Sequence, residues 1–211
     1  MIRPRRLLPC ALMARLVDVT RRTALLDRMV VYLGQHGLVD VSFRPMAKSL
    51  GVSVNALVHH FGTKDDLLAA ALRRSGHIQQ DVERRWKQRR PNISQVDLLR
   101  AWWKWITTSP ENLAIVRLGI EAVALERTLD GVARHHRGQQ IEYWRLNMEH
   151  GLLAEGVPPH IAAIESTLAK AMFTGLVVDL IASGQKARLT RALEFHLARL
   201  EQVVRESTMV A

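Results

Sequence analysis

The side chains best suited to bind a partner molecule are concentrated between Ser53 and Lys64. This segment combines hydroxyl, amide, imidazole and ammonium groups, which form hydrogen bonds, and it contains no carboxylate that would repel phosphate. The chemistry that it favours is non-covalent contact with nucleic acid. The candidate contact residues are Arg44, Ser53, Val54, Asn55, His59, His60 and Lys64.

Three kinds of contact with DNA are expected from these residues. Phosphate contacts, which give a salt-sensitive affinity, are expected from Arg44, His60 and Lys64. Asn55 is expected to contact a base edge, with adenine as the favoured base. Shape and methyl contacts are expected from two further positions, Ser53 and Val54.

Two short helices must position these side chains. The first, over residues 43–50, is predicted to have Ser42 as its N-cap and to end at Gly51, because glycine adopts the positive φ of a C-terminal turn. Ser53 is expected to cap the second helix, over residues 54–60. Two short helices joined by a tight glycine turn form a helix-turn-helix, whose second helix lies in the major groove.

The segment MAKSLGVSVNALVHHFGTKDDLL resembles the DNA-binding domain of the TetR family of bacterial transcription regulators. The similarity rests on many positions at fixed spacing rather than on Gly-Val-Ser alone. One position departs from the family pattern, because Val58 stands where a phosphate-contacting tyrosine is usual; Val58 is expected to touch a thymine methyl or to pack. The matching positions are Ala47, Gly51, Val52, Ser53, Leu57, His59, His60, Phe61, Lys64, Asp65, Asp66 and Leu67.

The excess positive charge of the chain is confined to its first 90 residues. The 211 residues carry a net charge of +10; residues 1–90 hold 17 Lys and Arg against 7 Asp and Glu, whereas residues 91–211 hold 13 of each. A basic excess in one domain is typical of phosphate binding. Solubility or a bias in arginine usage is the alternative, although bias would enrich both halves.

We therefore predict a DNA-binding head over residues 20–66, whose first helix runs from Thr20 to His36. Residues 1–19 are predicted to form a flexible basic arm, which either lies along phosphates or in a minor groove, or is disordered and has no role.

The rest of the chain is predicted to be helical, because no alternating Val- and Ile-rich runs appear. Thr63 and Asp66 indicate a capping box at the start of a long helix that ends near Arg90, before Pro91. The predicted fold is all-α, with a three-helix head joined by this long helix to a C-terminal helical bundle; residues 67–211 form the ligand-binding and dimerisation domain. Further helices are expected over residues 94–108, 110–126, 130–155, 161–182 and 189–204.

The last two predicted helices resemble the dimerisation pair of the family, through the stretch AMFTGLVVDLIASG. Gly175 would let another helix approach closely, and a helix as apolar as residues 161–182 needs covering on more than one side. The resemblance therefore implies a homodimer through about residues 159–206, with two helices from each protomer in a four-helix bundle. The alternative is that both are core helices of a monomer.

Aromatic residues are crowded into the predicted body, and the resemblance implies a ligand cavity there. Aromatic and Met side chains suit an apolar cavity between helices, although ordinary core packing is the alternative for each residue. Arg117 and Glu121, one turn apart, are expected to pair with each other rather than to bind ligand. The candidate ligand-binding residues are Trp102, Trp103, Ile106, Trp144, Met148 and Met172.

No pattern in the sequence predicts catalysis, a cofactor or a metal site. The nine histidines show no metal-ligand spacing, and neither a serine nucleophile elbow nor a glycine-rich phosphate loop is present. The lone cysteine, Cys10, excludes an internal disulfide framework and fits a reducing cytoplasm. No apolar run long enough to cross a bilayer is expected, so we predict no membrane partner.

The resemblance implies a cytoplasmic homodimer that binds a palindromic DNA operator. Repression, relieved by a small-molecule effector, is the commoner behaviour in the family. Two alternatives belong to other classes: an all-α ligand-binding protein or helical enzyme with a coincidental basic head, and an interaction module whose head has lost DNA binding. Neither alternative would prefer one DNA sequence over another.

Overall fold

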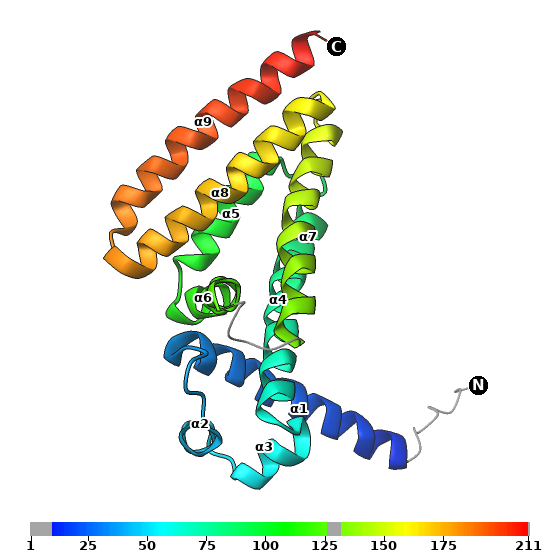
Figure 1. Ribbon diagram of the computed structural model, residues 1–211. Coiled ribbons are helices and arrows are strands. Elements are labelled where there is room, and N and C mark those ends of the chain that lie inside the picture. Colours follow the sequence, from blue (N-terminus) through cyan, green and yellow to red (C-terminus); the bar gives the residue numbers. More distant parts are fainter. Residues whose placement is uncertain (1–9, 126–131, 211) are drawn as a thin grey trace, which may run out of the picture.

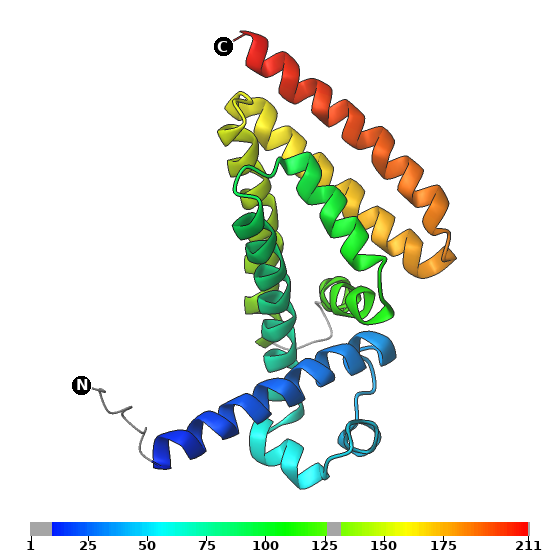
Figure 2. The same cartoon turned by 180° about the vertical axis from the view of Figure 1, so that it is seen from behind.

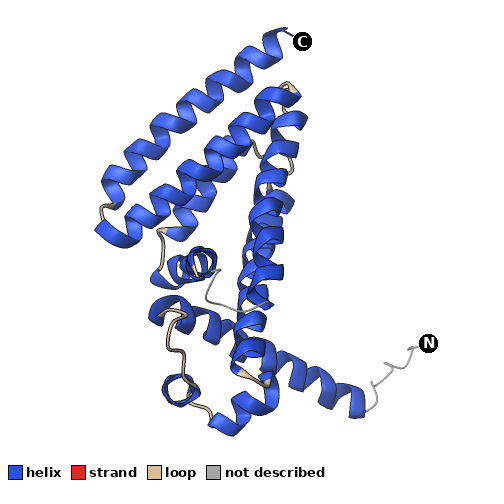
Figure 3. Ribbon diagram, viewed as in Figure 1, coloured by secondary structure: helices blue, strands red, loops and turns tan. Residues whose placement is uncertain are grey.

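The computed structural model of the chain describes residues 10–125 and 132–210. Within these residues the ordered elements are all helices, with no strand (Figure 3), which confirms the all-α prediction. The helices are α1 (Cys10–His36), α2 (Phe43–Leu50), α3 (Val54–Phe61), α4 (Lys64–Arg89), α5 (Gln95–Ile106), α6 (Pro110–Ala124), α7 (Val132–Ala154), α8 (Pro159–Ser183) and α9 (Lys186–Val210).

Helix α1 begins at Cys10, well before the predicted start at Thr20. Residues 10–19 of the predicted flexible arm are therefore helical, and residues 1–9 of that arm lie outside the described residues. The physical reason is local: Pro9 is followed by a stretch made mostly of Ala, Leu, Met and Arg, which are strong helix formers.

The short helices end and begin largely as predicted. Gly51 closes α2 in the left-handed region at φ 66°, and the Ser53 hydroxyl accepts a hydrogen bond from the Ala56 N–H at 3.1 Å. Ser42 precedes α2 but its hydroxyl makes no capping bond, which corrects the prediction. An N-cap hydroxyl accepts from the second or third residue of its helix, and the third here is Pro45, which has no N–H.

Helix α4 connects the head to the body. It starts beside α3 and runs upward, with α7 alongside it in both views (Figure 1, Figure 2). Helices α8 and α9 form an outer pair. Helix α6 lies across the junction, where it contacts α1 on one side and α4, α5, α7 and α8 on others.

Two buried clusters of apolar side chains organise these helices. The body cluster joins residues of α4, α5, α7, α8 and α9. The head cluster combines α1 to α4 with Ile115, Leu118 and Ala122 of α6, so the head is completed by a helix of the body. Leu67 and Leu68 of α4 are also buried in the head cluster, which extends head packing beyond residue 66.

Helices α1 and α6 touch backbone to backbone at Gly34. A Cβ atom at this position would lie 2.0 Å from the carbonyl oxygen of Ala114, so only glycine permits the approach. Just after α1, the Leu38 N–H donates to Glu121 Oε1 at 2.7 Å, and Glu121 Oε2 is buried without a hydrogen-bond partner. Glu121 thus holds the chain just after the end of α1. The sequence had predicted that Glu121 pairs with Arg117, and this prediction was wrong.

Helix α8 is more apolar than the sequence analysis expected. Its length and composition would allow it to cross a membrane, since an 18-residue window of the helix has a mean hydropathy of 1.5. The prediction that no such stretch exists was therefore wrong. Only 33% of that window is buried within the chain. One side of α8 packs on α7 and α9 and includes Glu165, which is ion-paired with Arg199; another side leaves Ile164 and Leu168 exposed.

The Gly34→Ala substitution should lower the free energy of unfolding by about 1–3 kcal/mol, because α1 and α6 must separate to admit a methyl group. Urea denaturation followed by circular dichroism measures this change. Gly119→Ala in α6 is the matched control: a Cβ there meets nothing within 4 Å, and alanine should raise the free energy of unfolding by up to about 1 kcal/mol. Equal destabilisation by the two variants would contradict the contact.

Candidate nucleic-acid interface and internal cavity

Helix α3 lies at the tip of the head, at the end of the molecule away from the C-terminus (Figure 1). Leu57 and Phe61 are buried and fix its inner side against the head cluster. Asn55, Val58 and His59 are exposed, and because Val58 and His59 lie three and four residues after Asn55 they share the outer face with it. Such an exposed face on a firmly packed second helix is what contact with a DNA groove requires.

The other candidate contact residues lie in or next to α2, α3 and α4. Arg44 lies in the first turn of α2 and Lys64 in the first turn of α4, and both are exposed. Val54 and His60 are half-buried, and Val54 packs against the head cluster. Ser53 is exposed, with its hydroxyl oxygen engaged by the Ala56 N–H, so its proton is still available to donate. Five of the seven predicted residues thus lie in α3 or at its N-cap, and Arg44 and Lys64 lie in the first turns of the neighbouring helices α2 and α4.

Two arginines of α1 cap the C-terminal ends of the short helices. Arg28 Nη2 donates to the Leu50 carbonyl at 2.5 Å, at the end of α2. Arg22 Nε donates to the His60 carbonyl at 3.2 Å, at the end of α3, and its guanidinium lies 5.1 Å from the centroid of the Phe61 ring. Cations at helix C-termini satisfy free carbonyls and oppose the helix dipole. Sequence analysis missed these roles because the partners lie 22 and 38 residues away.

Two sets of polar contacts hold the first half of α4. Thr63 and Asp66 form the predicted capping box, and hydrogen bonds from Thr63 lower the pKa of the Asp66 carboxyl. Arg74 donates to both carboxylate oxygens of Asp27 in α1, at 2.5 and 3.1 Å. The capping box fixes the first turn of α4, which carries Lys64, and Arg74 ties α4 to α1 ten residues further along.

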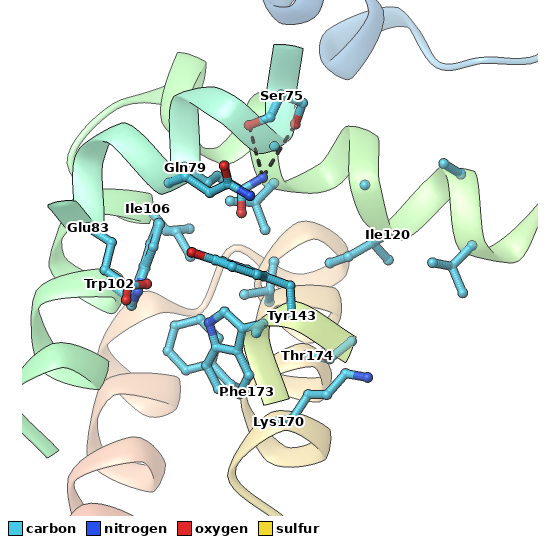
Figure 4. Close-up of a pocket in the computed structure, with 18 of the residues that line it drawn as sticks. Ser75, Gln79, Glu83, Trp102, Ile106, Ile120, Tyr143, Lys170, Phe173 and Thr174 are labelled. Atoms are coloured by element: carbon cyan, nitrogen blue, oxygen red, sulfur yellow. Dashed lines mark hydrogen bonds between the residues drawn. The ribbon is translucent and has the colours of Figure 1, made fainter. Parts of the chain in front are cut away.

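A cavity of about 350 Å³ lies in the body, between α4, α5, α6, α7 and α8. Its walls are mainly aliphatic and aromatic, and Figure 4 shows the Tyr143 ring lying across it, with Phe173 below. A volume of this size and an apolar wall with a few polar groups are typical of a small-molecule site.

Three of the six predicted ligand-binding residues line this cavity: Trp102, Ile106 and Trp144. Trp103 lies elsewhere, since its Nε1 donates to Thr190 Oγ1 of α9 at 2.8 Å. Met148 borders a small side cavity of about 20 Å³, and Met172 packs in the body cluster.

The sequence analysis missed most of the polar residues of the wall. Helix α4 contributes Ser75, Gln79 and Glu83, and α8 contributes Lys170. A signal was available for α4, because Gln79 and Glu83 follow Leu72 at helical spacings of seven and eleven residues and so continue its buried face. Polar side chains on a buried helix face indicate a site rather than a core.

Helix α6 belongs both to the cavity wall and to the head. Val116 and Ile120 face the cavity, whereas Ile115 and Leu118 belong to the head cluster. Ser75 Oγ, a cavity-wall group, donates to the Ile115 carbonyl of α6 at 2.9 Å. The cavity and the head are therefore separated by one helix.

The outer pair of helices leaves large apolar side chains uncovered. Phe195 of α9 is 82% exposed, and Ile164, Leu168 and Val178 of α8 are about half exposed. A Cβ atom at Gly175 would meet nothing within 4 Å. For the residues that the structure describes, no group of three or more His, Cys, Asp or Glu is placed to hold a metal ion.

The Arg22→Met substitution should lower the free energy of unfolding by about 1 kcal/mol, because α3 loses both its C-terminal cap and the cation over Phe61. Thermal and urea unfolding measure this loss. The neighbouring exposed residue provides the control, since Arg21→Met removes the same charge and should change stability by less than about 0.5 kcal/mol. If both variants were equally stable, the cap would contribute nothing.

Comparison with known proteins agrees with this architecture. A family model described as "Bacterial regulatory proteins, tetR family" matches residues 25–71, from within α1 into α4. Among curated proteins no sequence matches the chain.

Solved structures share the fold of nearly the whole chain. A transcriptional regulator from Rhodococcus sp. Rha1 is 23% identical, with a TM-score of 0.69 over 86% of this chain and 95% of that one. A protein assigned to the TetR-family transcriptional regulators from Rhodococcus sp. is 20% identical, with a TM-score of 0.65 over 87% and 98%. The multidrug binding protein EbrR, solved with imidazole, is 20% identical, with a TM-score of 0.55 over 84% and 89%. The head therefore matches the tetR family model in sequence, and the chain as a whole shares its fold with these solved structures.

Proposed function

We propose that this protein is a homodimeric repressor that binds a palindromic DNA operator and leaves it when a small molecule enters the cavity. Regulators of the TetR family are DNA-binding transcription factors. The observation that carries the proposal is the exposed polar face of α3, held in place by caps and buried contacts in the basic part of the chain.

The position of each side chain decides which part of the DNA it contacts. Asn55 contacts a base edge from the outer face of α3, and His59 lies on the same face. Arg44, His60 and Lys64 contact phosphate from around that face. Because Val58 is 46% exposed, it is available to touch a thymine methyl, in agreement with the role expected from the sequence.

A dimer forms through residues 159–206, where α8 and α9 leave apolar side chains uncovered. Phe195, Ile164 and Leu168 would be removed from water by a second copy of the same pair. A two-fold axis through this four-helix interface would present two copies of α3, and two equivalent recognition helices require a palindromic site.

The effector acts through α6. A ligand against Val116 and Ile120 displaces α6, and the backbone contact between Ala114 and Gly34 passes the displacement to α1. Since α1 caps α2 and α3 through Arg28 and Arg22, the recognition helices move with it. A ligand that binds the displaced state more tightly shifts the population to dimers that are wrongly spaced for the operator.

Selection of bound duplexes from a random DNA pool, at two salt concentrations, tests the proposal. Enrichment of a palindrome whose half-sites are about one helical turn apart is the expected outcome. Binding without sequence preference that disappears at the higher salt would reject the regulator. The protein would then be an all-α ligand-binding protein or an interaction module with a basic head.

The Asn55→Ala variant should relax the base preference at one position of each half-site and weaken binding of the selected operator by about 1–3 kcal/mol. Repeating the selection with the variant measures this. A uniform loss of affinity on every sequence would remove Asn55 from base contact.

The Lys64→Ala variant should weaken binding on all sequences and reduce the slope of log affinity against log salt by about one. Fluorescence anisotropy over a salt series measures the slope. Lys104→Ala, an exposed lysine of α5 in the body, is the control for the change in net charge and should leave the slope unaltered. An unchanged slope for Lys64→Ala would exclude the phosphate contact.

A further inference from the structure

The wall of the cavity contains two side chains of opposite charge. Glu83 enters from α4 and Lys170 from α8, and Figure 4 shows them on opposite sides of the Tyr143 ring. If the cavity binds the effector, as proposed above, these two groups determine which charge the effector carries.

Glu83 is already neutralised by its own helix. Lys87, one turn later in α4, lies 2.7 Å from Glu83 Oε1, and the Glu83 side chain is only 16% exposed. A cationic ligand would have to compete with this partner. Glu83 therefore offers little attraction for a positive group.

Lys170 has no such partner. It is half-buried in α8, and among the described residues it makes no hydrogen bond or ion pair. The charges that act on it are Glu142 and Arg145 of α7, but Arg145 holds Glu142 at 2.5 Å and Glu149 at 2.5 Å. Burial lowers the pKa of the Lys170 ammonium, Arg145 lowers it further, and Glu142 opposes both effects. An anion from a ligand would supply the missing counter-charge.

The remainder of the cavity wall favours a ligand with a flat, apolar ring system. Four aromatic side chains line the cavity: Trp102, Tyr143, Trp144 and Phe173. The Trp144 and Phe173 rings lie 6.2 Å apart, centroid to centroid, with an interplanar angle of 32°. Aromatic faces and edges arranged in this way bind a planar ring system by offset and edge contacts.

We propose that the effector is an aromatic carboxylate, whose ring system lies among these four side chains and whose carboxylate pairs with Lys170. Thr174, one turn after Lys170 on α8, lies beside it in Figure 4 and provides a hydroxyl donor for the same group. The opposite orientation is disfavoured because it would bring the carboxylate to Glu83, whose cation partner Lys87 is already engaged, and would leave Lys170 without a counter-charge.

Matched pairs of probes that differ only in charge test the proposal. Benzoate and benzamide, 2-naphthoate and 2-naphthamide, and biphenyl-4-carboxylate and its amide are titrated into the 211-residue chain by isothermal titration calorimetry. For at least one pair, the acid should bind the unmodified protein about tenfold more tightly than the amide, as expected for one charge-assisted hydrogen bond.

Four variants locate the source of this preference. Lys170→Met should abolish the preference for the acid and leave the affinity for the amide unchanged, which also shows that the cavity is still formed. Lys170→Arg should retain the preference. Glu83→Gln removes the other charge of the same wall and should leave the preference for the acid unchanged or increase it. Lys104→Met, outside the cavity, should not change the preference.

The outcomes separate this proposal from the proposed function. Equal binding of acid and amide, or a preference that survives in Lys170→Met, would reject the carboxylate while leaving the cavity as the effector site. If no probe of any size binds, both the carboxylate and the effector role of the cavity fail. DNA recognition is unaffected by either result, because the duplex selection tests it separately.

Discussion

The contact between the backbones of α1 and α6 is the constraint on which the rest of the structure depends. At Gly34 no side chain separates the two helices, so neither can shift without moving the other. Helix α1 in turn caps both short helices of the head, through Arg28 and Arg22. Because the other side of α6 forms cavity wall, the proposed DNA-binding surface and the proposed effector site are parts of one packed unit.

The basic residues of the head have two roles. Arg22, Arg28 and Arg74 are engaged inside the head, with helix carbonyls and with the Asp27 carboxylate, and they hold α1, α2, α3 and α4 together. Arg44 and Lys64 are exposed around α3 and are the cations proposed to meet phosphate. Part of the positive charge of the head therefore holds its helices together.

The apolar residues of α8 lie on two sides of the helix, and each side has its own explanation. One side is buried against α7 and α9, where even a charged residue, Glu165, is accommodated by pairing with Arg199. The other side leaves Ile164 and Leu168 in contact with solvent in the single chain. Composition alone makes such a helix indistinguishable from a membrane span, and a second copy of the chain is the proposed cover.

The sequence by itself determined the helical class, the helix-turn-helix and most helix ends. Those features depend on interactions between residues close in the chain: the positive φ of Gly51, the Ser53 cap and the Thr63 capping box. Local rules also explain the errors, since the cap at Ser42 failed because of Pro45 and α1 extended back to the residue after Pro9.

Only the tertiary structure decided which side chains meet in the cavity and at the junction. Trp102 and Trp103 are neighbours in sequence, yet one lines the cavity and the other bonds to Thr190 of α9. Lys170 and Glu121 likewise take their roles from helices far away in the chain. Helical periodicity fixes the direction in which a side chain points, but what it meets there depends on how the helices pack.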